Sequence, residues 1–435
     1  MNIAILGFDR QGRSAYDYWN KPDNKITICD KDVNIKVPLG ADAQLGDDYL
    51  SGLERFDLLI RTPGLHPRLI EESGGSSALN KVTTVTNEFL RVCPTKNVIG
   101  VTGTKGKGTT STLIAKMLEK NNFRVHLGGN IGIAPLELLK RDIQPSDWVV
   151  LELANFQLID LKLSPHIGVC LMVEPEHLDW HKDAEEYFEA KRQLFAHQTK
   201  EDIAIYFFEN QISRSIASGG NAQLIPYYAS PGAFIKERAL YIDGTCVCKT
   251  DEFALLGEHN WQNICAAVTC VWQIKQDLAP IKEVLTSFTG LPFRLQFIAE
   301  KNGVRYYNDS FSSQPAATMA AIRAIRGQKV LIVGGKDRGL DLTHLASTIA
   351  DDAENFRKII IIGESAARLA DTLTQSGFSN FLITGDKDMD QVVKRASSYA
   401  EAGDTIILSP GFPSFDMFKN FEERGELFNS AVDGL

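Results

Sequence analysis

The sequence predicts an α/β protein of three domains, each built on a mostly parallel sheet. The chain has 435 residues, which is too long for a single hydrophobic core. Apolar runs of strand length alternate with stretches of helical length in three successive regions, a pattern typical of parallel sheets covered by helices. Hydrophobic residues make up 44% of the chain and charged residues 23%, as in ordinary soluble globular proteins.

The composition argues against several classes of protein. The chain has 46 basic and 55 acidic residues, a net charge of −9, and no long run of Lys or Arg, so we expect no binding to nucleic acid or to an anionic membrane. No stretch approaches the ~20 apolar residues that span a bilayer, and the opening MNIAILGFDRQG predicts a strand and turn rather than a signal peptide. The seven scattered cysteines favour reduced thiols in the cytoplasm.

Residues 1–95 are predicted to form the first domain, with strands at residues 3–6, 25–29 and 56–60 and a helix at residues 11–19. Asp30 closes the second strand, and the turn Arg61-Thr62-Pro63-Gly64 follows the third. Ligands gather at such carboxyl ends in open parallel sheets. Gly7-x-x-x-x-Gly12 is not a full dinucleotide fingerprint, so Gly7 makes either a plain tight turn or a phosphate contact.

Residues 96–290 are predicted to form the second domain, which opens with NVIGVTGTKGKGTTSTL at residues 97–113. This segment predicts a buried strand, a glycine-rich loop and a helix over residues 109–117. Backbone N–H groups in such a loop converge on a phosphate chain, and Lys107 reaches its outer phosphates. The match to GxxxxGK[ST] is imperfect, because the first glycine is Gly100, one residue early, and Gly108 replaces the hydroxyl residue that follows the lysine. The context still predicts ATP binding.

The remaining elements of this domain continue the α/β alternation. Strands are predicted at residues 124–127, 148–153, 167–172, 203–207 and 224–227, and residues 229–257 are expected to add short antiparallel strands. Residues 291–435 are predicted to form a third, doubly wound domain with strands at residues 329–333, 358–362, 380–383 and 405–408 and a helix at residues 315–326. The loops NDSFSSQ and SPGFPS are expected to face one cleft.

Several polar residues are candidates for chemistry, although spacing alone leaves their roles open. Glu152 lies in the apolar strand WVVLELANFQL and is either a metal ligand or a solvated edge residue. His177 is a loop histidine or a site residue. The helical spacing of Lys191 indicates a solvated charge. Asn263, near a helix start, is a cap or a ligand contact, and Arg294 is a surface arginine or a phosphate clamp.

Taken together, the segments resemble the Mur ligases over the whole chain. The stretches that carry this resemblance are VTGTKGKGTT, GGNIG, LELANFQL, EPEHLD, EAKRQLF, GEHNWQN, LPFRLQF, YNDSFSSQPAAT, VGGKDRGLD and LSPGFPSFDMFKNFEERGE. They are most similar to members that use ATP to add D-glutamate to UDP-N-acetylmuramoyl-L-alanine in peptidoglycan precursor synthesis. The resemblance implies a Rossmann-like UDP-sugar domain, a central P-loop ATPase-type domain and a C-terminal Rossmann-like domain that binds the amino acid.

The resemblance also assigns roles by position. Lys107, Glu152, His177 and Lys191 would be catalytic, with Lys191 carrying a CO2-derived carbamate. Mg²⁺ would be held by Thr109, Glu152, His177 and Lys191. The contacts to ATP would be Gly103, Thr104, Lys105, Gly106, Lys107, Gly108, Thr109, Thr110, Asn263, Arg294 and Asp309. The nucleotide-sugar and the glutamate would contact Asp30, Lys31, Thr62, Pro63, Gly64, Asn130, His177, Ser313, Arg338, Ser414 and Phe421.

Three departures from the family pattern bear on specificity. Phe311 stands where the family usually has a lysine near the glutamate, Arg338 replaces the lysine of the GGxxKG stretch, and Gly108 resembles the loop of folylpolyglutamate synthases. One alternative is therefore a ligase of the same mechanism with another amino acid or acceptor, L-glutamate or a folate included. The other is a nucleotide-binding regulator that has lost catalysis. Nothing in the sequence requires an oligomer, so a monomer is expected.

Overall fold

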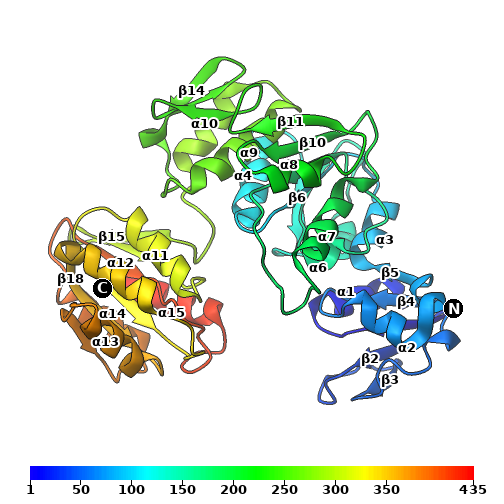
Figure 1. Ribbon diagram of the computed structural model, residues 1–435, viewed down its shortest axis with the longest axis horizontal. Coiled ribbons are helices and arrows are strands. Elements are labelled where there is room, and N and C mark those ends of the chain that lie inside the picture. The colour runs from blue at the N-terminus through cyan, green and yellow to red at the C-terminus, as the bar shows by residue number, and fades with distance from the viewer. The chain divides into compact units, whose positions relative to one another are not determined.

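Parallel strand pairing dominates the computed structural model, which describes residues 1–435. The chain divides into two compact units: the first contains Met1–Glu252 and Gln262–Leu285, and the second contains Phe253–Trp261 and Thr286–Leu435. In Figure 1 the first unit is coloured mainly blue to green and the second mainly yellow to red. The predicted α/β fold class is confirmed. None of the helices combines the length and the apolar character needed to cross a membrane.

The N-terminal sheet of the first unit has the strand order β3-β2-β1-β4-β5, and all its strands are parallel. The strands are β1 (Asn2–Leu6), β2 (Lys25–Asp30), β3 (Asp42–Leu45), β4 (Leu58–Arg61) and β5 (Val82–Thr84). The helices are α1 (Arg10–Trp19), α2 (Pro67–Leu79) and α3 (Val85–Val92). The strand order reverses beside β1, so the loops after β1 and β4 meet at the edge where such sheets bind ligands.

The second sheet of this unit has the order β11-β10-β9-β6-β8-β7 and is also entirely parallel. Its strands are β6 (Val98–Thr102), β7 (Val125–Gly129), β8 (Trp148–Glu152), β9 (Ile167–Cys170), β10 (Ile203–Phe207) and β11 (Gln223–Tyr227). The helices are α4 (Lys107–Lys120), α5 (Pro135–Leu138), α6 (Asn155–Leu158), α7 (Ala184–Ala196), α8 (Gln211–Ala217), α9 (Asn260–Trp272) and α10 (Leu278–Ser287).

Two local predictions for this region have different outcomes. The predicted antiparallel strands are confirmed as β12 (Phe234–Lys236), β13 (Ala239–Ile242) and β14 (Thr245–Lys249). The predicted helix over residues 109–117 was too short at both ends. Helix α4 begins at Lys107 because Gly106, with φ +86°, forms its N-cap, and the chain leaves the helix before Asn122, whose φ is also positive.

The sheet of the second unit has the order β15-β16-β20-β17-β18-β19, with only β15 antiparallel to its neighbour. The strands are β15 (Gln296–Lys301), β16 (Val304–Asn308), β17 (Lys329–Gly334), β18 (Phe356–Ile362), β19 (Phe381–Ile383) and β20 (Thr405–Leu408). The helices are α11 (Pro315–Ala324), α12 (Thr343–Asp351), α13 (Ala366–Gln375), α14 (Met389–Ser397) and α15 (Phe421–Asp433).

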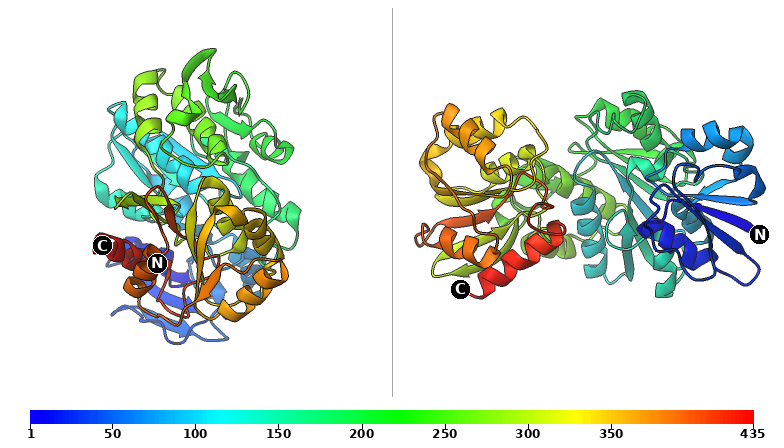
Figure 2. Two further views of the ribbon diagram at one scale, coloured as in Figure 1. Left: turned by 90° about the vertical axis from the view of Figure 1, so that its left-hand side faces the viewer. Right: turned by 90° about the horizontal axis from the view of Figure 1, so that it is seen from below.

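Helices cover both faces of this sheet, as the turned views in Figure 2 show. Alternate residues of β17 point to opposite faces. Leu331 and Val333 pack with residues of α11, α12 and α13, whereas Val330 and Ile332 pack with residues of α14 and α15. The sheet is therefore buried on both sides, which accounts for the nearly continuous apolar sequence of its central strands.

A buried arginine joins the two parallel sheets of the first unit. Arg61, at the end of β4, is 1% exposed. Its guanidinium donates to both carboxylate oxygens of Asp160 at 2.6 Å, and also to the carbonyl oxygens of Phe156 and Leu65 at 2.9 and 2.8 Å. Such bidentate pairing compensates a charge that is otherwise costly to bury.

We predict that Arg61→Ala lowers the free energy of unfolding of the first unit by about 3–5 kcal/mol, because it leaves Asp160 without its buried partner. Urea unfolding followed by tryptophan fluorescence measures this, since Trp19, Trp148 and Trp180 lie in this unit. Lys25→Ala is the control and should cost less than about 1 kcal/mol, because its ion pair with Asp42 is largely exposed. Equal effects of the two substitutions would contradict the prediction.

Candidate functional site

The glycine-rich loop between β6 and α4 is packed tightly against the start of α9. Gly106 adopts φ +86°, and a Cβ atom at this position would lie 2.1 Å from the Oδ1 atom of Asn263. The hydroxyl of Thr110 contacts the same amide oxygen at 3.4 Å. Asn263 therefore lies beside the loop, and a side chain at residue 106 would displace the Asn263 amide.

Two predicted catalytic lysines meet at this loop. The Nζ atoms of Lys107 and Lys191 each donate to the carbonyl oxygen of Gly103 at 3.0 Å, and Lys107 also donates to that of Thr104 at 2.9 Å. Lys191 is 1% exposed, so the solvated charge inferred from its spacing was wrong. Burial, together with the positive charge of Lys107, holds the pKa of Lys191 well below its usual value.

Glu152 is the last residue of β8, the strand next to β6, and so lies at the end of the sheet from which the glycine-rich loop begins. Its side chain is buried and accepts a hydrogen bond from the Nδ2 atom of Asn130 at 2.9 Å. The reading of Glu152 as a solvated edge residue is therefore wrong. Among the other residues of the loop, Gly108 and Thr109 are buried, and Lys105 is exposed and pairs with Glu174 at 3.3 Å.

His177 lies in the loop after β9 and is exposed, with φ +58°. Its ring centroid is 4.8 Å from that of Phe156 and 6.4 Å from that of Tyr187. The hydroxyl of Tyr187 in turn shares a hydrogen bond with that of Thr104 at 2.9 Å. Tyr187 was not among the residues predicted for the site. The presence of a phenol there, rather than a phenyl ring, was the available sign of a polar contact.

The predicted residues of the N-terminal sheet lie at the carboxyl ends of β2 and β4, on either side of β1. The carboxylate of Asp30 accepts backbone N–H groups of Phe8 at 2.6 Å and Asp32 at 2.9 Å, and Lys31 beside it is exposed. The hydroxyl of Thr62 donates to the carbonyl of Leu6 at 2.7 Å. Pro63 is half-buried, and Gly64 is exposed.

In the second unit the two predicted loops are hydrogen-bonded to each other. Asp309 accepts the hydroxyls of Ser312 at 2.5 Å and Ser409 at 2.7 Å, and the N–H of Gly411 donates to the carbonyl of Ser312 at 2.9 Å. Burial raises the pKa of Asp309 to about 6. Arg424 was not foreseen: it is 1% exposed and donates to the carbonyl of Ser310 at 2.7 Å. Its segment, FEERGE, resembles a surface helix and gives no sign of this burial.

Phe311, one of the departures from the family pattern, contacts both a cation and an aromatic ring. The guanidinium of Arg294 lies 3.7 Å from the ring centroid of Phe311, and the ring of Phe421 meets that of Phe311 edge-on at 5.0 Å. The structure thus brings three of the singled-out residues together. Ser414 is buried, whereas Ser313 and Arg338 are exposed.

Comparisons with known proteins agree over the whole chain. Residues 101–271 match the Mur ligase middle domain, and residues 293–412 match the Mur ligase glutamate ligase domain. Two relatives are named UDP-N-acetylmuramoylalanine–D-glutamate ligase. The one from Acetivibrio thermocellus is 36% identical, with 100% of this chain and 96% of the relative covered. The one from Ruminiclostridium cellulolyticum has the same identity and the same coverage.

Solved structures show the same fold at lower identity. A MurF structure from Acinetobacter baumannii has a TM-score of 0.64 at 17% identity, covering 99% of this chain and 90% of that one. The UDP-N-acetylmuramate-alanine ligase MurC from Thermotoga maritima has a TM-score of 0.63 at 15% identity, covering 100% and 99%. With 36% identity to its relatives over its full length, the chain belongs to the Mur ligase family.

Proposed function

We propose that the protein is the ligase that uses ATP to join D-glutamate to UDP-N-acetylmuramoyl-L-alanine in peptidoglycan precursor synthesis. The full-length similarity to relatives of that name supports this. The observation that carries the proposal is the convergence of Lys107 and Lys191 on the carbonyl of Gly103, in a loop beside the buried carboxylate of Glu152. Two amines that meet at a glycine-rich loop suit the transfer of a highly charged phosphoryl group.

The reaction needs a leaving group on an unreactive carboxylate. An oxygen of the acceptor carboxylate attacks the γ-phosphorus of ATP, the bond to the β-phosphate oxygen breaks, and ADP leaves. The amine of D-glutamate then attacks the carbonyl carbon of the acyl phosphate, phosphate departs, and the amine loses a proton. Lys107 is the residue proposed to neutralise charge on the transferring phosphoryl group, and the loop N–H groups are proposed to orient it.

The donor set fits Mg²⁺, because Thr109 and Glu152 offer the oxygen ligands this ion prefers; His177 is proposed as a further ligand. When bound, the ion would neutralise charge on the phosphates. Burial, together with the positive charge of Lys107, lowers the pKa of Lys191 and so favours its neutral, nucleophilic amine. That amine can add to CO2 and release a proton, which would turn it into an anionic carbamate ligand.

We further propose the roles that the family pattern gives to the three regions. Residues 1–95 would bind the UDP-sugar through Asp30, Lys31, Thr62, Pro63 and Gly64, with Asn130 on the neighbouring region. Residues 96–290 would bind ATP, and residues 291–435 would bind the amino acid through Ser313, Arg338, Ser414 and Phe421. Asn263, Arg294 and Asp309 would hold adenosine. The protein is proposed to act as a cytoplasmic monomer.

The contact of Phe311 with Arg294 favours one alternative, a ligase for a different amino acid. A phenyl ring cannot pair with a carboxylate as lysine does, and the guanidinium of Arg294 lies over its face instead. Arg338, which replaces the lysine of the GGxxKG stretch, is exposed and can bind a carboxylate through two N–H groups. L-Glutamate and folate-type acceptors belong to this alternative, whereas a regulator without catalysis would show no turnover.

We predict phosphate release that requires ATP, Mg²⁺, UDP-N-acetylmuramoyl-L-alanine and D-glutamate together. The measurement compares D-glutamate, L-glutamate and no amino acid with the purified protein. Release with L-glutamate alone, or only with a folate acceptor, would replace the proposed substrate and retain the mechanism. No release under any condition would favour the regulator.

We predict that Lys191→Ala lowers kcat by at least about 100-fold, because it removes the anionic carbamate proposed for the reacting centre. Lys200→Ala, at an exposed lysine of the same unit, should leave kcat unchanged. Acetate or formate should restore part of the activity of Lys191→Ala by replacing the lost carboxylate. A carbamate signal in carbon NMR with labelled bicarbonate provides a second readout, and full activity of Lys191→Ala would rule out the role.

Asp309 should make the stability of the second unit depend on pH. Its folded pKa of about 6 lies above the unfolded value of about 4, so the folded unit binds this proton more tightly. The associated stability is complete below pH 4 and is lost as the pH rises through 6, a change of roughly 3 kcal/mol.

Urea unfolding of wild type and Asp309→Asn at pH 4 and pH 7 measures this change as a difference between the two proteins. Asp371→Asn, at an exposed carboxylate, should follow wild type at both values. A constant difference between wild type and Asp309→Asn at the two pH values would contradict the prediction.

A further inference from the structure

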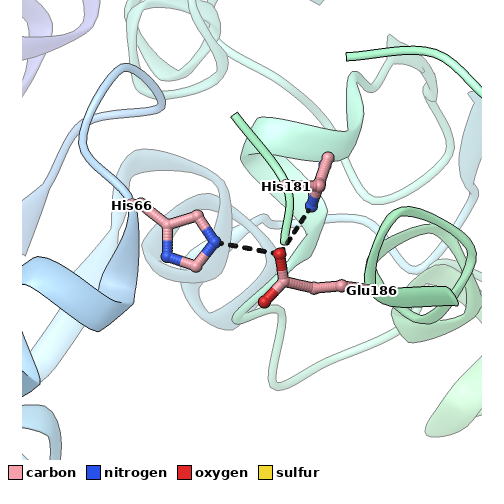
Figure 3. Close-up of side chains that lie close together, drawn as sticks. All are labelled: His66, His181 and Glu186. Atoms are coloured by element: carbon pink, nitrogen blue, oxygen red, sulfur yellow. Dashed lines mark hydrogen bonds and ion pairs between the residues drawn. The ribbon is translucent and has the colours of Figure 1, made fainter. Parts of the chain in front are cut away.

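A network of hydrogen bonds crosses between the two parallel sheets of the first unit, outside the residues assigned above. Figure 3 shows its centre, where the imidazoles of His66 and His181 both point at one carboxylate oxygen of Glu186. His66 is the N-cap of α2, His181 lies in the loop before α7, and Glu186 lies in the first turn of α7. Both histidines are buried.

The hydrogen bonds fix which ring nitrogens carry protons. The Nδ1 atom of His66 accepts the N–H of Arg68 at 3.1 Å, so its Nε2 atom carries a proton and donates to Oε2 of Glu186 at 3.2 Å. The Nε2 atom of His181 lies 2.7 Å from the Nδ2 atom of Asn155, which donates to it. The Nδ1 atom of His181 is therefore the donor to Oε2 of Glu186, also at 3.2 Å.

Glu186 is well suited to hold this network. The same Oε2 atom accepts a third hydrogen bond, from the backbone N–H of Lys182 at 2.8 Å, while the side chain of Asp183 caps the Glu186 N–H at 2.9 Å. Burial alone raises the pKa of Glu186, but the hydrogen bonds from Lys182 and His66 outweigh it and leave the pKa below its usual value. The carboxylate is thus a fixed anion that accepts three N–H groups.

Two histidines and a glutamate also form a common zinc donor set, and their ligand atoms lie within 4.8 Å of one another. The protons argue against a metal here. A metal-bound imidazole donates its other N–H to an acceptor, whereas the Nδ1 atom of His66 faces the N–H of Arg68, a donor. The cluster is therefore complete as a set of hydrogen bonds.

The network joins three segments that carry residues of the proposed reaction. His66 follows the turn of Thr62 and Gly64, and Trp180 reinforces the link because its Nε1 atom donates to the carbonyl of Gly64 at 3.3 Å and its ring lies 4.3 Å from that of His66. Asn155 stands three residues after Glu152, and Glu186 stands five residues before Lys191 on the same helix.

We infer that Glu186 is a positioning residue for the ligase reaction, which holds the turn of Thr62–Gly64 in register with the segments of Glu152 and Lys191. The inference rests on the proposed function, because it takes that turn to contact the UDP-sugar. It adds a coupling between the nucleotide-sugar loop and the helix of the buried lysine. When the network is broken, the turn loses its fixed place before the acceptor binds.

The test compares Glu186→Gln with Glu185→Gln, a matched control in the same helical turn whose side chain is 69% exposed. Glu186→Gln should raise KM for UDP-N-acetylmuramoyl-L-alanine about tenfold, as expected for the loss of a charge-assisted hydrogen bond, and lower kcat, with KM for ATP unchanged. A purely structural role would reduce the amount of active enzyme and leave every KM as it was. That outcome would overturn the inference.

Amide hydrogen exchange of the ligand-free proteins separates this inference from the proposed function, since it needs no turnover. The amides of Leu65 and Arg68 should exchange at least tenfold faster in Glu186→Gln than in Glu185→Gln. Equal rates would overturn the inference even in an active ligase. Faster exchange in a protein without ligase activity would retain the network and remove the proposed function.

Two further measurements complete the test. His66→Ala combined with Glu186→Gln should be no worse than the more impaired single variant, because both break one network; additive effects would overturn it. If Glu186→Gln does not fold, Trp180→Phe, which removes the N–H to Gly64 and part of the ring contact with His66, should raise the same KM. Elemental analysis should find no zinc that depends on Glu186, and one zinc ion per chain lost in Glu186→Gln would establish a metal site instead.

Discussion

The parallel pairing of β6 with β8 and β9 is the constraint on which the site of the first unit depends. It places the carboxyl ends of the three strands side by side, so the loop after β6 lies next to Glu152. Strand β7 pairs with the other side of β8 and ends at Gly129. Glycine is required at this position, because a Cβ atom there would lie 2.2 Å from the carbonyl oxygen of Glu152. The polar groups converge because the strand pairing fixes the backbone positions that carry them.

Within this arrangement, the charges of two lysines are the main influence on which ligands the site favours. Lys107 and Lys191 share one carbonyl oxygen, and Lys191 is wholly buried. Two ammonium groups so placed repel each other, and burial penalises the charge of the inner one. The arrangement favours either a neutral amine or a nearby anion. A phosphate at Lys107 and a carboxylated Lys191 would each relieve the repulsion, so the resting structure is already biased toward the ligands proposed for it.

The sequence predicted the buried parts of the fold well, because central parallel strands are apolar runs of characteristic length. It did not predict β3, whose DAQL segment is polar and largely exposed, the short strand β5, or the antiparallel pair β15 and β16, although β16 is mostly buried. The site was reached mainly through family resemblance. Helical spacing predicted that Lys191 would be a surface residue. This prediction was wrong because the loop that contacts its amine lies 88 positions earlier in the chain. No local pattern announces such a long-range contact.

The contacts between the two sheets of the first unit can form only late in synthesis. His66 meets Glu186 across 120 positions, and Arg61 meets Asp160 across 99. The N-terminal sheet therefore leaves the ribosome well before its partners exist, and domains tend to fold as they emerge. During that interval Arg61 and His66 are hydrated, so this part of the surface that later contacts the second sheet is polar. A nascent chain with such a surface is less prone to stick to its neighbours than one that exposes bare hydrocarbon.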